Sequence, residues 1–159
     1  MRSLWLTICF ILPVWTVACG AVQAEALSGH AYVIDGDTLV IRGRHVRLFG
    51  VDAFEQDQMC GGFTCGRQAR SVMDGLVQSI IVTCDQQDTD PYGRVVAICR
   101  TSGGLDLGRE MVRRGLAVDY RHFSRRYMAD EDYARTHRLG AWAYGFDSPQ
   151  TWRRAHPHN

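Results

Sequence analysis

Two carboxylates lie on either side of a glycine in "VIDGDT" (residues 33–38), directly after an apolar run. Strands usually avoid aspartate, so Asp35 and Asp37 either form a tight turn or include an acid that binds a ligand. An Asp-Gly pair is a strong hairpin-turn signal, and it assigns Asp35 to the turn. Asp37 is therefore the better candidate for a chemical role.

A second acid, Asp52, comes close to Asp37 if the chain folds back on itself. A hairpin over residues 38–51 that turns about residues 44–45 places position 37 opposite position 52. Two ionised carboxylates this close repel each other, so either one takes up a proton or a cation lies between them. Oxygen ligands without a nearby His or Cys favour Ca²⁺ or Mg²⁺ over zinc. The alternative is a pair of ordinary turn acids.

The N-terminus has the three parts of a secretory signal peptide. Arg2 precedes the apolar run "LWLTICFILPVWTVA" and a small-residue exit. We expect cleavage after Ala24, so that residues 1–24 are removed and the protein is periplasmic or secreted. The apolar run is short for a membrane span, so none is expected after processing. The alternative is lipid attachment at Cys19 in "TVAC".

Four cysteines follow the predicted leader: Cys60, Cys65, Cys84 and Cys99. An even number in an exported chain indicates two disulfides, with three possible connectivities. The type I turn signature "DPYG" (residues 90–93) places Cys84 opposite Cys99 on paired strands, within disulfide reach. Cys60 then pairs with Cys65.

The hydrophobic pattern predicts one domain of the α+β class, mostly β. Length and an apolar content of 46% are enough for one domain with a core. Strands are predicted at residues 30–34, 38–42, 45–51, 79–84 and 94–99. Helices are predicted from residue 66, over 107–114 and over 128–139. This order of five short strands and three helices suggests a small closed barrel that carries helices.

The net charge of +1 neither indicates nor excludes a nucleic-acid partner. All 18 basic residues are arginine. Arginine is the better residue for two-pronged phosphate contacts, but a codon bias explains its use equally well.

The chain resembles a known family in four stretches that occur in order. "IDGDTLVIRGRHVRLFGVDAFEQD", "DPYGR", "VRRGLA" and "GAWAYGFDSPQTWRR" resemble the thermonuclease, or staphylococcal-nuclease-like, family over about residues 30–154. The resemblance implies a five-stranded OB-fold barrel with three helices, here over residues 28–154. It also implies a calcium-dependent nuclease that hydrolyses phosphodiester bonds of DNA and RNA and leaves 3′-phosphorylated products.

The resemblance implies a metal site built from five residues. Asp37 and Asp52 would supply carboxylate ligands to Ca²⁺, and Ala53 would supply a backbone carbonyl. Asp35 and Thr38 would shape and support the metal loop.

The resemblance also implies a catalytic set. Glu55 would be the general base that activates the attacking water, and Arg47 and Arg94 would hold the phosphate. Tyr92 and Tyr120 match positions near the bound nucleotide.

Two departures from the family pattern bear on these roles. Phe54 replaces a proline that usually precedes the base, so the loop loses a fixed φ angle and Phe54 is open to stacking on a base. Pro91 replaces a basic residue, which removes one phosphate contact.

Two alternatives to an enzyme are a non-catalytic OB-type module that binds nucleic acid or protein, and an inhibitor-like or envelope-scaffold protein. Binding modules of that kind typically lose the acids or the arginines. This chain keeps all five of these residues, which are Asp37, Asp52, Glu55, Arg47 and Arg94. We expect a monomer that acts on nucleic acid.

Overall fold

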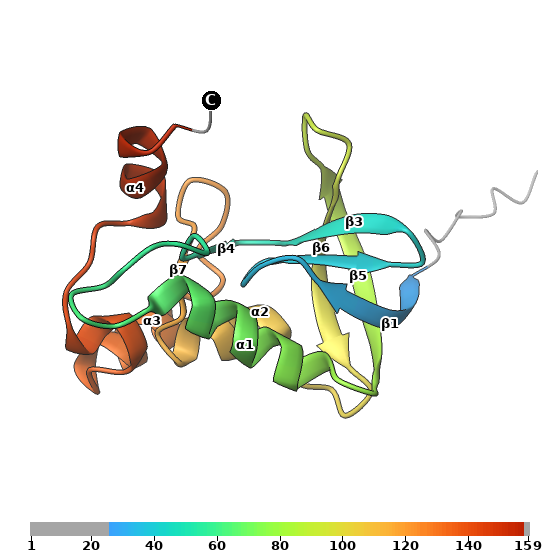
Figure 1. The fold of residues 1–159 in the computed structure, drawn as a ribbon. Coiled ribbons are helices and arrows are strands. Elements are labelled where there is room, and N and C mark those ends of the chain that lie inside the picture. Colours follow the sequence, from blue (N-terminus) through green and yellow to red (C-terminus); the bar gives the residue numbers. More distant parts are fainter. Residues whose placement is uncertain (1–25, 158–159) are drawn as a thin grey trace, which may run out of the picture.

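The computed structural model describes residues 26–157. Five strands close a barrel in the order β1-β2-β3-β6-β5, in which only the β3–β6 pairing is parallel (Figure 1). This architecture confirms the predicted mostly-β barrel with helices. The barrel strands are β1 (Leu27–Val33), β2 (Thr38–Ile41), β3 (Arg44–Leu48), β5 (Ile81–Thr89) and β6 (Val95–Thr101).

The predicted strand over residues 45–51 is divided in two by a turn. β3 ends at Leu48, and the chain then turns at Gly50, whose φ of 72° is in the left-handed region that favours glycine. β4 (Val51–Ala53) leaves the barrel and pairs with the short strand β7 (Ala117–Asp119). This turn redirects the chain just before Asp52.

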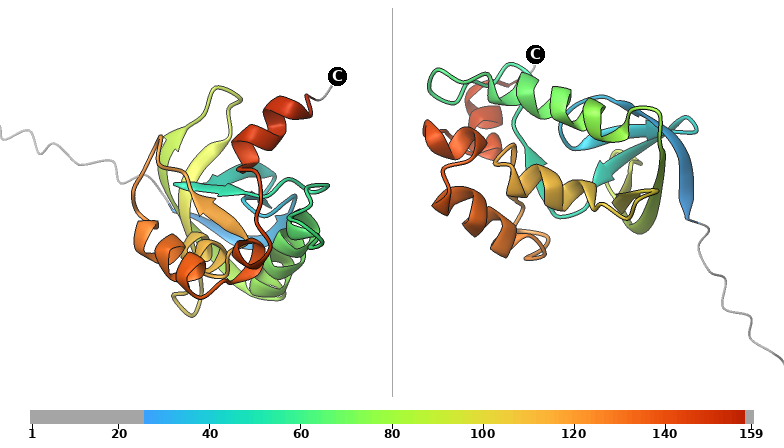
Figure 2. Two further views of the ribbon diagram at one scale, coloured as in Figure 1. Left: turned by 90° about the vertical axis from the view of Figure 1, so that its left-hand side faces the viewer. Right: turned by 90° about the horizontal axis from the view of Figure 1, so that it is seen from below.

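Four α-helices are present in the described residues, one more than predicted. They are α1 (Cys65–Val77), α2 (Leu107–Arg113), α3 (Met128–Thr136) and α4 (Pro149–Ala155), with a 3₁₀ turn over Gly140–Ala143. α1 and α2 lie next to each other along the barrel, whereas α4 stands apart from them, on the side of the β5–β6 turn (Figures 1 and 2). α4 has a regular start, because Ser148 accepts the Thr151 N–H and Pro149 occupies the first turn.

The core joins the barrel interior to one face each of α1 and α2. Met73 of α1 and Met111 of α2 are fully buried against it. Each large apolar side chain buried there contributes about 1.5–3 kcal/mol. The barrel strands supply Val33, Leu39, Ile41, Val46, Leu48, Val82, Val95 and Ala97. This core gives the site a rigid base.

Both predicted disulfides are present. Cys84 and Cys99 are directly opposite on β5 and β6, with Cα atoms 4.0 Å apart. Cys60 pairs with Cys65 at a Cα separation of 5.7 Å. The predicted leader and Cys19 lie outside the described residues. Within residues 26–157, no helix has the length and apolarity needed to cross a membrane.

Removing the Cys84–Cys99 disulfide should destabilise the protein strongly. The double variant Cys84→Ala/Cys99→Ala should lose about 3 kcal/mol of unfolding free energy, because the bridge closes a 15-residue separation. Urea titration measures this loss. Cys60→Ala/Cys65→Ala, which opens a separation of 5, should lose about 1 kcal/mol less. Equal losses would contradict the loop-closure explanation.

Candidate active site

Most of the predicted site residues line one cleft of about 560 Å³. The cleft lies between the β2–β4 region, the β5–β6 turn and α4. It is lined by Asp35, Asp37, Arg47, Ala53, Glu55, Tyr92, Arg94 and Tyr120, together with Phe123 and Arg153. Asp52 is buried behind this wall and is hydrogen-bonded to two of the lining arginines.

Asp37 and Asp52 do approach each other, but the predicted hairpin register is wrong. The β2–β3 hairpin turns at Arg42–Gly43, so Thr38 pairs with Arg47, and position 37 is not opposite position 52. The two acids meet because β4 follows the turn at Gly50 and leaves the barrel beside Asp37, which lies just before β2 and accepts the Ala53 N–H. Only 3% of Asp37 and 2% of Asp52 are exposed.

One guanidinium joins the two buried acids. Arg47 Nη1 donates to Asp37 Oδ1 at 2.8 Å, and Nη2 donates to Asp52 Oδ1 at 3.1 Å. Asp37 also accepts the Thr38 hydroxyl at 3.0 Å and the Ala53 N–H at 2.9 Å. The Asp37 carboxylate is thus fixed from β2, β3 and β4 at once.

Glu55 follows β4 on a loop with little freedom. Its carbonyl accepts the Gln58 N–H at 2.8 Å, and its N–H donates to Gln58 Oε1 at 3.2 Å. A Cβ at Gly66 would lie 1.6 Å from the Glu55 carbonyl oxygen, so only glycine lets the first turn of α1 approach so closely. The Glu55 side chain is 28% exposed at the cleft.

Phe54 does not stack on a bound base. It is 1% exposed and packs edge-on against Phe146, at 4.9 Å between ring centroids. Burial of the ring, rather than a proline φ angle, holds the loop before Glu55. The same contact fixes the segment that leads into α4.

Arg94 is held in place by Asp90 at the β5–β6 turn. Asp90 accepts the Arg94 backbone N–H at 2.9 Å and Nε at 2.7 Å. Burial acts to raise the pKa of Asp90, but the hydrogen bonds from Arg94 outweigh it, and the pKa lies below its ordinary value. Within residues 26–157, the terminal nitrogens of Arg94 have no hydrogen-bond acceptor. They are free to bind an anion in the cleft.

Aromatic rings lie at the cleft rim. Tyr92 is 86% exposed, and Arg94 Cζ lies 5.6 Å from its ring centroid. Tyr120 contacts Phe123, which is 64% exposed, at 5.0 Å between centroids. Exposed rings of this kind can stack on bases. Phe123 was not predicted; its only sequence signal is an aromatic residue within the polar stretch "YRHFSRR".

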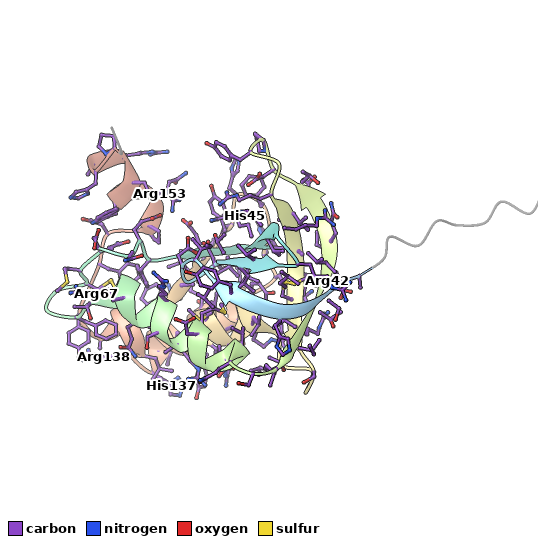
Figure 3. All side chains as sticks on the ribbon, turned by 45° about the vertical axis from the view of Figure 1, so that its right-hand side comes forward. Arg42, His45, Arg67, His137, Arg138 and Arg153 are labelled. Carbon is purple, nitrogen blue, oxygen red and sulfur yellow. A yellow bond between two sulfur atoms is a disulfide. The ribbon has the colours of Figure 1, made fainter. Side chains whose placement is uncertain are left out.

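Arg153 of α4 is the second unpredicted member of the site (Figure 3). Its Nη1 and Nη2 donate to Asp52 Oδ1 and Oδ2 at 3.0 and 3.1 Å, and Nη1 also donates to Glu55 Oε1 at 2.7 Å. Ser148–Pro149 could have signalled the helix. No local pattern could have paired Arg153 with an acid 101 residues away.

Negative charge is in excess at the floor of the cleft. Burial, and secondly the charge of Asp37, raise the pKa of Asp35 from 3.8 to about 6. Burial also raises the pKa of Asp52, although Arg153 acts in the opposite direction. The charge of Asp37 contributes to both shifts, so positive charge placed near Asp37 would stabilise the ionised carboxylates.

Asp35 should make the metal-free protein less stable as pH rises. Its folded-state pKa exceeds its unfolded value, so the folded state binds more protons, and the contribution is lost between about pH 4 and 6. Asp35→Asn keeps the acceptor for the Asp37 N–H but does not titrate. The unfolding free energy of Asp35→Asn, relative to that of wild type, should therefore increase by about 1–2 kcal/mol between about pH 4.5 and 7.5. Urea titration with chelator tests this, and a pH-independent difference would contradict it.

The residues present fit a hard cation. The donors are the carboxylates of Asp37 and Asp52, which guanidinium groups neutralise in this structure, so that Arg153 is a stand-in for a cation at Asp52. Within residues 26–157, no group of three or more His, Cys, Asp or Glu side chains is arranged to hold a metal. Further ligands would therefore be a backbone carbonyl, such as that of Ala53, and water.

Comparison with known proteins identifies the family. Residues 45–144 match the profile of the staphylococcal nuclease homologues. The succinoglycan biosynthesis protein ExoI of Rhizobium meliloti (strain 1021) is 33% identical over 143 residues, covering 86% of this chain and 75% of ExoI. Protein ParB of Escherichia coli is 31% identical, covering 87% and 85%. An uncharacterized endonuclease of Escherichia coli is 27% identical, covering 81% and 82%. The chain belongs to the staphylococcal nuclease homologue family.

Proposed function

We propose that this protein is a calcium-dependent nuclease that hydrolyses phosphodiester bonds of DNA and RNA and leaves 3′-phosphorylated products. The observation that carries the proposal is the convergence of four side chains on one cleft. Arg47 links Asp37 to Asp52, and Arg153 links Asp52 to Glu55. Arg94 lines the same cleft, and within residues 26–157 its terminal nitrogens have no acceptor.

Each residue has a task in this reaction. Glu55 takes a proton from a water molecule, whose oxygen forms a bond to phosphorus. The bond from phosphorus to the 5′ oxygen breaks, which leaves a 3′-phosphate and, after protonation from solvent, a 5′-hydroxyl. Arg94 donates two hydrogen bonds to phosphate oxygens, whose charge is greater in the transition state. Arg47 anchors Asp37 and Asp52 through Nη1 and Nη2, and its remaining N–H groups would donate to the same phosphate.

Asp37, Asp52 and the Ala53 carbonyl would hold Ca²⁺. When bound, Ca²⁺ supplies positive charge that screens the phosphodiester and orients a phosphoryl oxygen. Asp35 and Thr38 support the loop that carries Asp37. The raised pKa values of Asp35 and Asp52 support a cation here, because added positive charge would relieve both.

An enzyme is favoured over a non-catalytic binding module. A binding module needs a charged or aromatic surface, but it does not need a glutamate, two buried aspartates and two arginines at one cleft. Family membership and the name of the Escherichia coli endonuclease relative support hydrolysis of nucleic acid. Tyr92 and Tyr120 at the rim would stack on bases and add affinity with little sequence preference.

The proposal extends to processing and location. Residues 1–24 would be removed as a signal peptide, and residues 28–154 would form the nuclease domain. Two disulfides support an exported, periplasmic or secreted protein, because such bonds persist in oxidising compartments. The enzyme would act as a monomer.

Digestion of supercoiled plasmid by the purified mature chain tests the proposal. We expect nicked and linear products with Ca²⁺ and unchanged plasmid with EGTA. Plasmid that is bound in a gel-shift assay but never cleaved, with Ca²⁺ present, would favour the binding module instead.

A further inference from the structure

The contact between Arg153 and the acids has no counterpart among the roles assigned so far. Arg153 makes a two-pronged ion pair with Asp52 and a third hydrogen bond to Glu55. The inference below rests on the proposed function, in which Asp52 binds the metal and Glu55 is the base. Both acids are therefore occupied by one side chain in this structure.

The contact is built into the fold. Phe54, beside Glu55, packs on Phe146, and Gln58 Nε2 donates to the Asp147 carbonyl at 2.8 Å. These two contacts tie the loop after β4 to the chain that enters α4. Ser148 then starts α4 with a side-chain cap, and Arg153 reaches Asp52 and Glu55 from the second turn of α4. Packing thus presents Arg153 to the site, unlike a chance surface ion pair.

Arg153 and a metal ion compete for the same atoms. Arg153 bonds to both Asp52 oxygens, and Arg47 also bonds to Oδ1. A cation that shares Asp37 and Asp52 needs at least one of these oxygens. The Arg153 side chain is 34% exposed, so it can leave the acids for solvent without unfolding the core.

We propose that Arg153 is an intramolecular competitor of the divalent cation, and that it sets the metal affinity of the site. Without metal, Arg153 neutralises Asp52 and covers Glu55 Oε1, the atom that would take the proton from water. Metal binding displaces Arg153 from Asp52 and frees Glu55. The enzyme is thereby held with its base blocked until the cation is present.

The competition predicts the size of the effect. If the released state makes up about a tenth of the metal-free molecules, the apparent Kd for metal is raised about tenfold. Arg153→Gln should therefore bind Ca²⁺ about tenfold more tightly than wild type. Arg153→Lys keeps the charge but cannot make the two-pronged contact, and it should fall between the two.

Ca²⁺ titration by calorimetry, with no nucleic acid present, tests the proposal. Arg154→Gln is the matched control, because it removes the same charge from the next residue of α4, which is exposed. The proposal requires Arg153→Gln, but not Arg154→Gln, to tighten Ca²⁺ binding. A loss of folding would weaken binding, so tightening cannot come from damage to the structure.

The outcomes separate this inference from the proposed function. If Arg153→Gln and Arg154→Gln bind Ca²⁺ equally, or if Arg153→Gln binds it more weakly, the competition is wrong and the nuclease proposal stands. If neither wild type nor any variant takes up Ca²⁺, even with a single-stranded oligonucleotide added, both are wrong.

Discussion

Replacing Glu55 with glutamine will lower the rate of phosphodiester cleavage by about 10²–10⁴-fold, the usual contribution of a general base. Glutamine keeps the size and polarity of the side chain but cannot accept the proton. The Glu55 backbone contacts with Gln58 do not depend on the side chain, so the loop should keep its position. Glutamine can still accept the hydrogen bond from Arg153, and losing the charge of this ion pair should change stability by about 0–1 kcal/mol.

Single-turnover cleavage of an end-labelled oligonucleotide with Ca²⁺ measures the effect. Glu110→Gln is the matched control, because Glu110 of α2 pairs with Arg114, the residue that follows the helix, and does not line the cleft. We expect wild-type rates for Glu110→Gln. A Glu55→Gln variant that cleaves as fast as wild type would remove Glu55 from the mechanism.

Replacing Arg94 with alanine will lower the cleavage rate by about 10²–10³-fold, the usual cost of one charge-stabilising donor. The geometry explains why the loss should be so large. Asp90 fixes Arg94 through Nε and the backbone, so its terminal nitrogens are already in position when phosphate arrives. The Arg94 side chain therefore needs little rearrangement to donate its hydrogen bonds to the phosphate in the transition state.

Two further variants make the Arg94 experiment specific. Arg100→Ala is the control, because Arg100 lies on the same hairpin but pairs with Asp85 and does not line the cleft. Asp90→Asn loses the charge that orients Arg94, and we expect a smaller loss of rate. Equal rates for Arg94→Ala and Arg100→Ala would contradict a role for Arg94 at the phosphate.

The parts of the fold that local patterns specify were predictable. The turn "DPYG" predicts that Cys84 lies opposite Cys99, and the two cysteines are paired in the structure. The register next to the turn differs from the prediction by one residue, since Thr89 pairs with Val95, and the bulge between Gln86 and Asp88 restores the pairing of Cys84 with Cys99. Barrel strands and helices followed from the period of their apolar residues.

The approach of Asp37 to Asp52 was predicted, but from the wrong hairpin. The prediction assumed one strand over residues 45–51, whereas Gly50 turns the chain out of the barrel. A glycine with positive φ inside an apolar run is hard to tell from one that merely weakens a strand. The acids meet because the turn at Arg42–Gly43 brings β3 beside β2, and the turn at Gly50 then directs β4 past Asp37.

Arg153 and the burial of Phe54 depend on long-range packing. Phe54 is buried among Cys60, Cys65 and Ala141 and packs on Phe146. Arg153 reaches Asp52 from α4, a helix that begins shortly after Phe146. Asp52 is 101 residues away from Arg153 in the sequence, so no local motif signals the contact. Tertiary packing therefore brings to this site the guanidinium group of Arg153, which no local sequence motif would include.

End-group analysis of a cleaved oligonucleotide tests the central claim most directly. A 5′-labelled single strand is incubated with the mature chain in Ca²⁺ or in EGTA, and the products are treated with a 3′-phosphatase. The account predicts products only with Ca²⁺, each slowed on the gel by the phosphatase because it carries a 3′-phosphate. Cleavage that persists in EGTA, or the absence of any product in Ca²⁺, would contradict it.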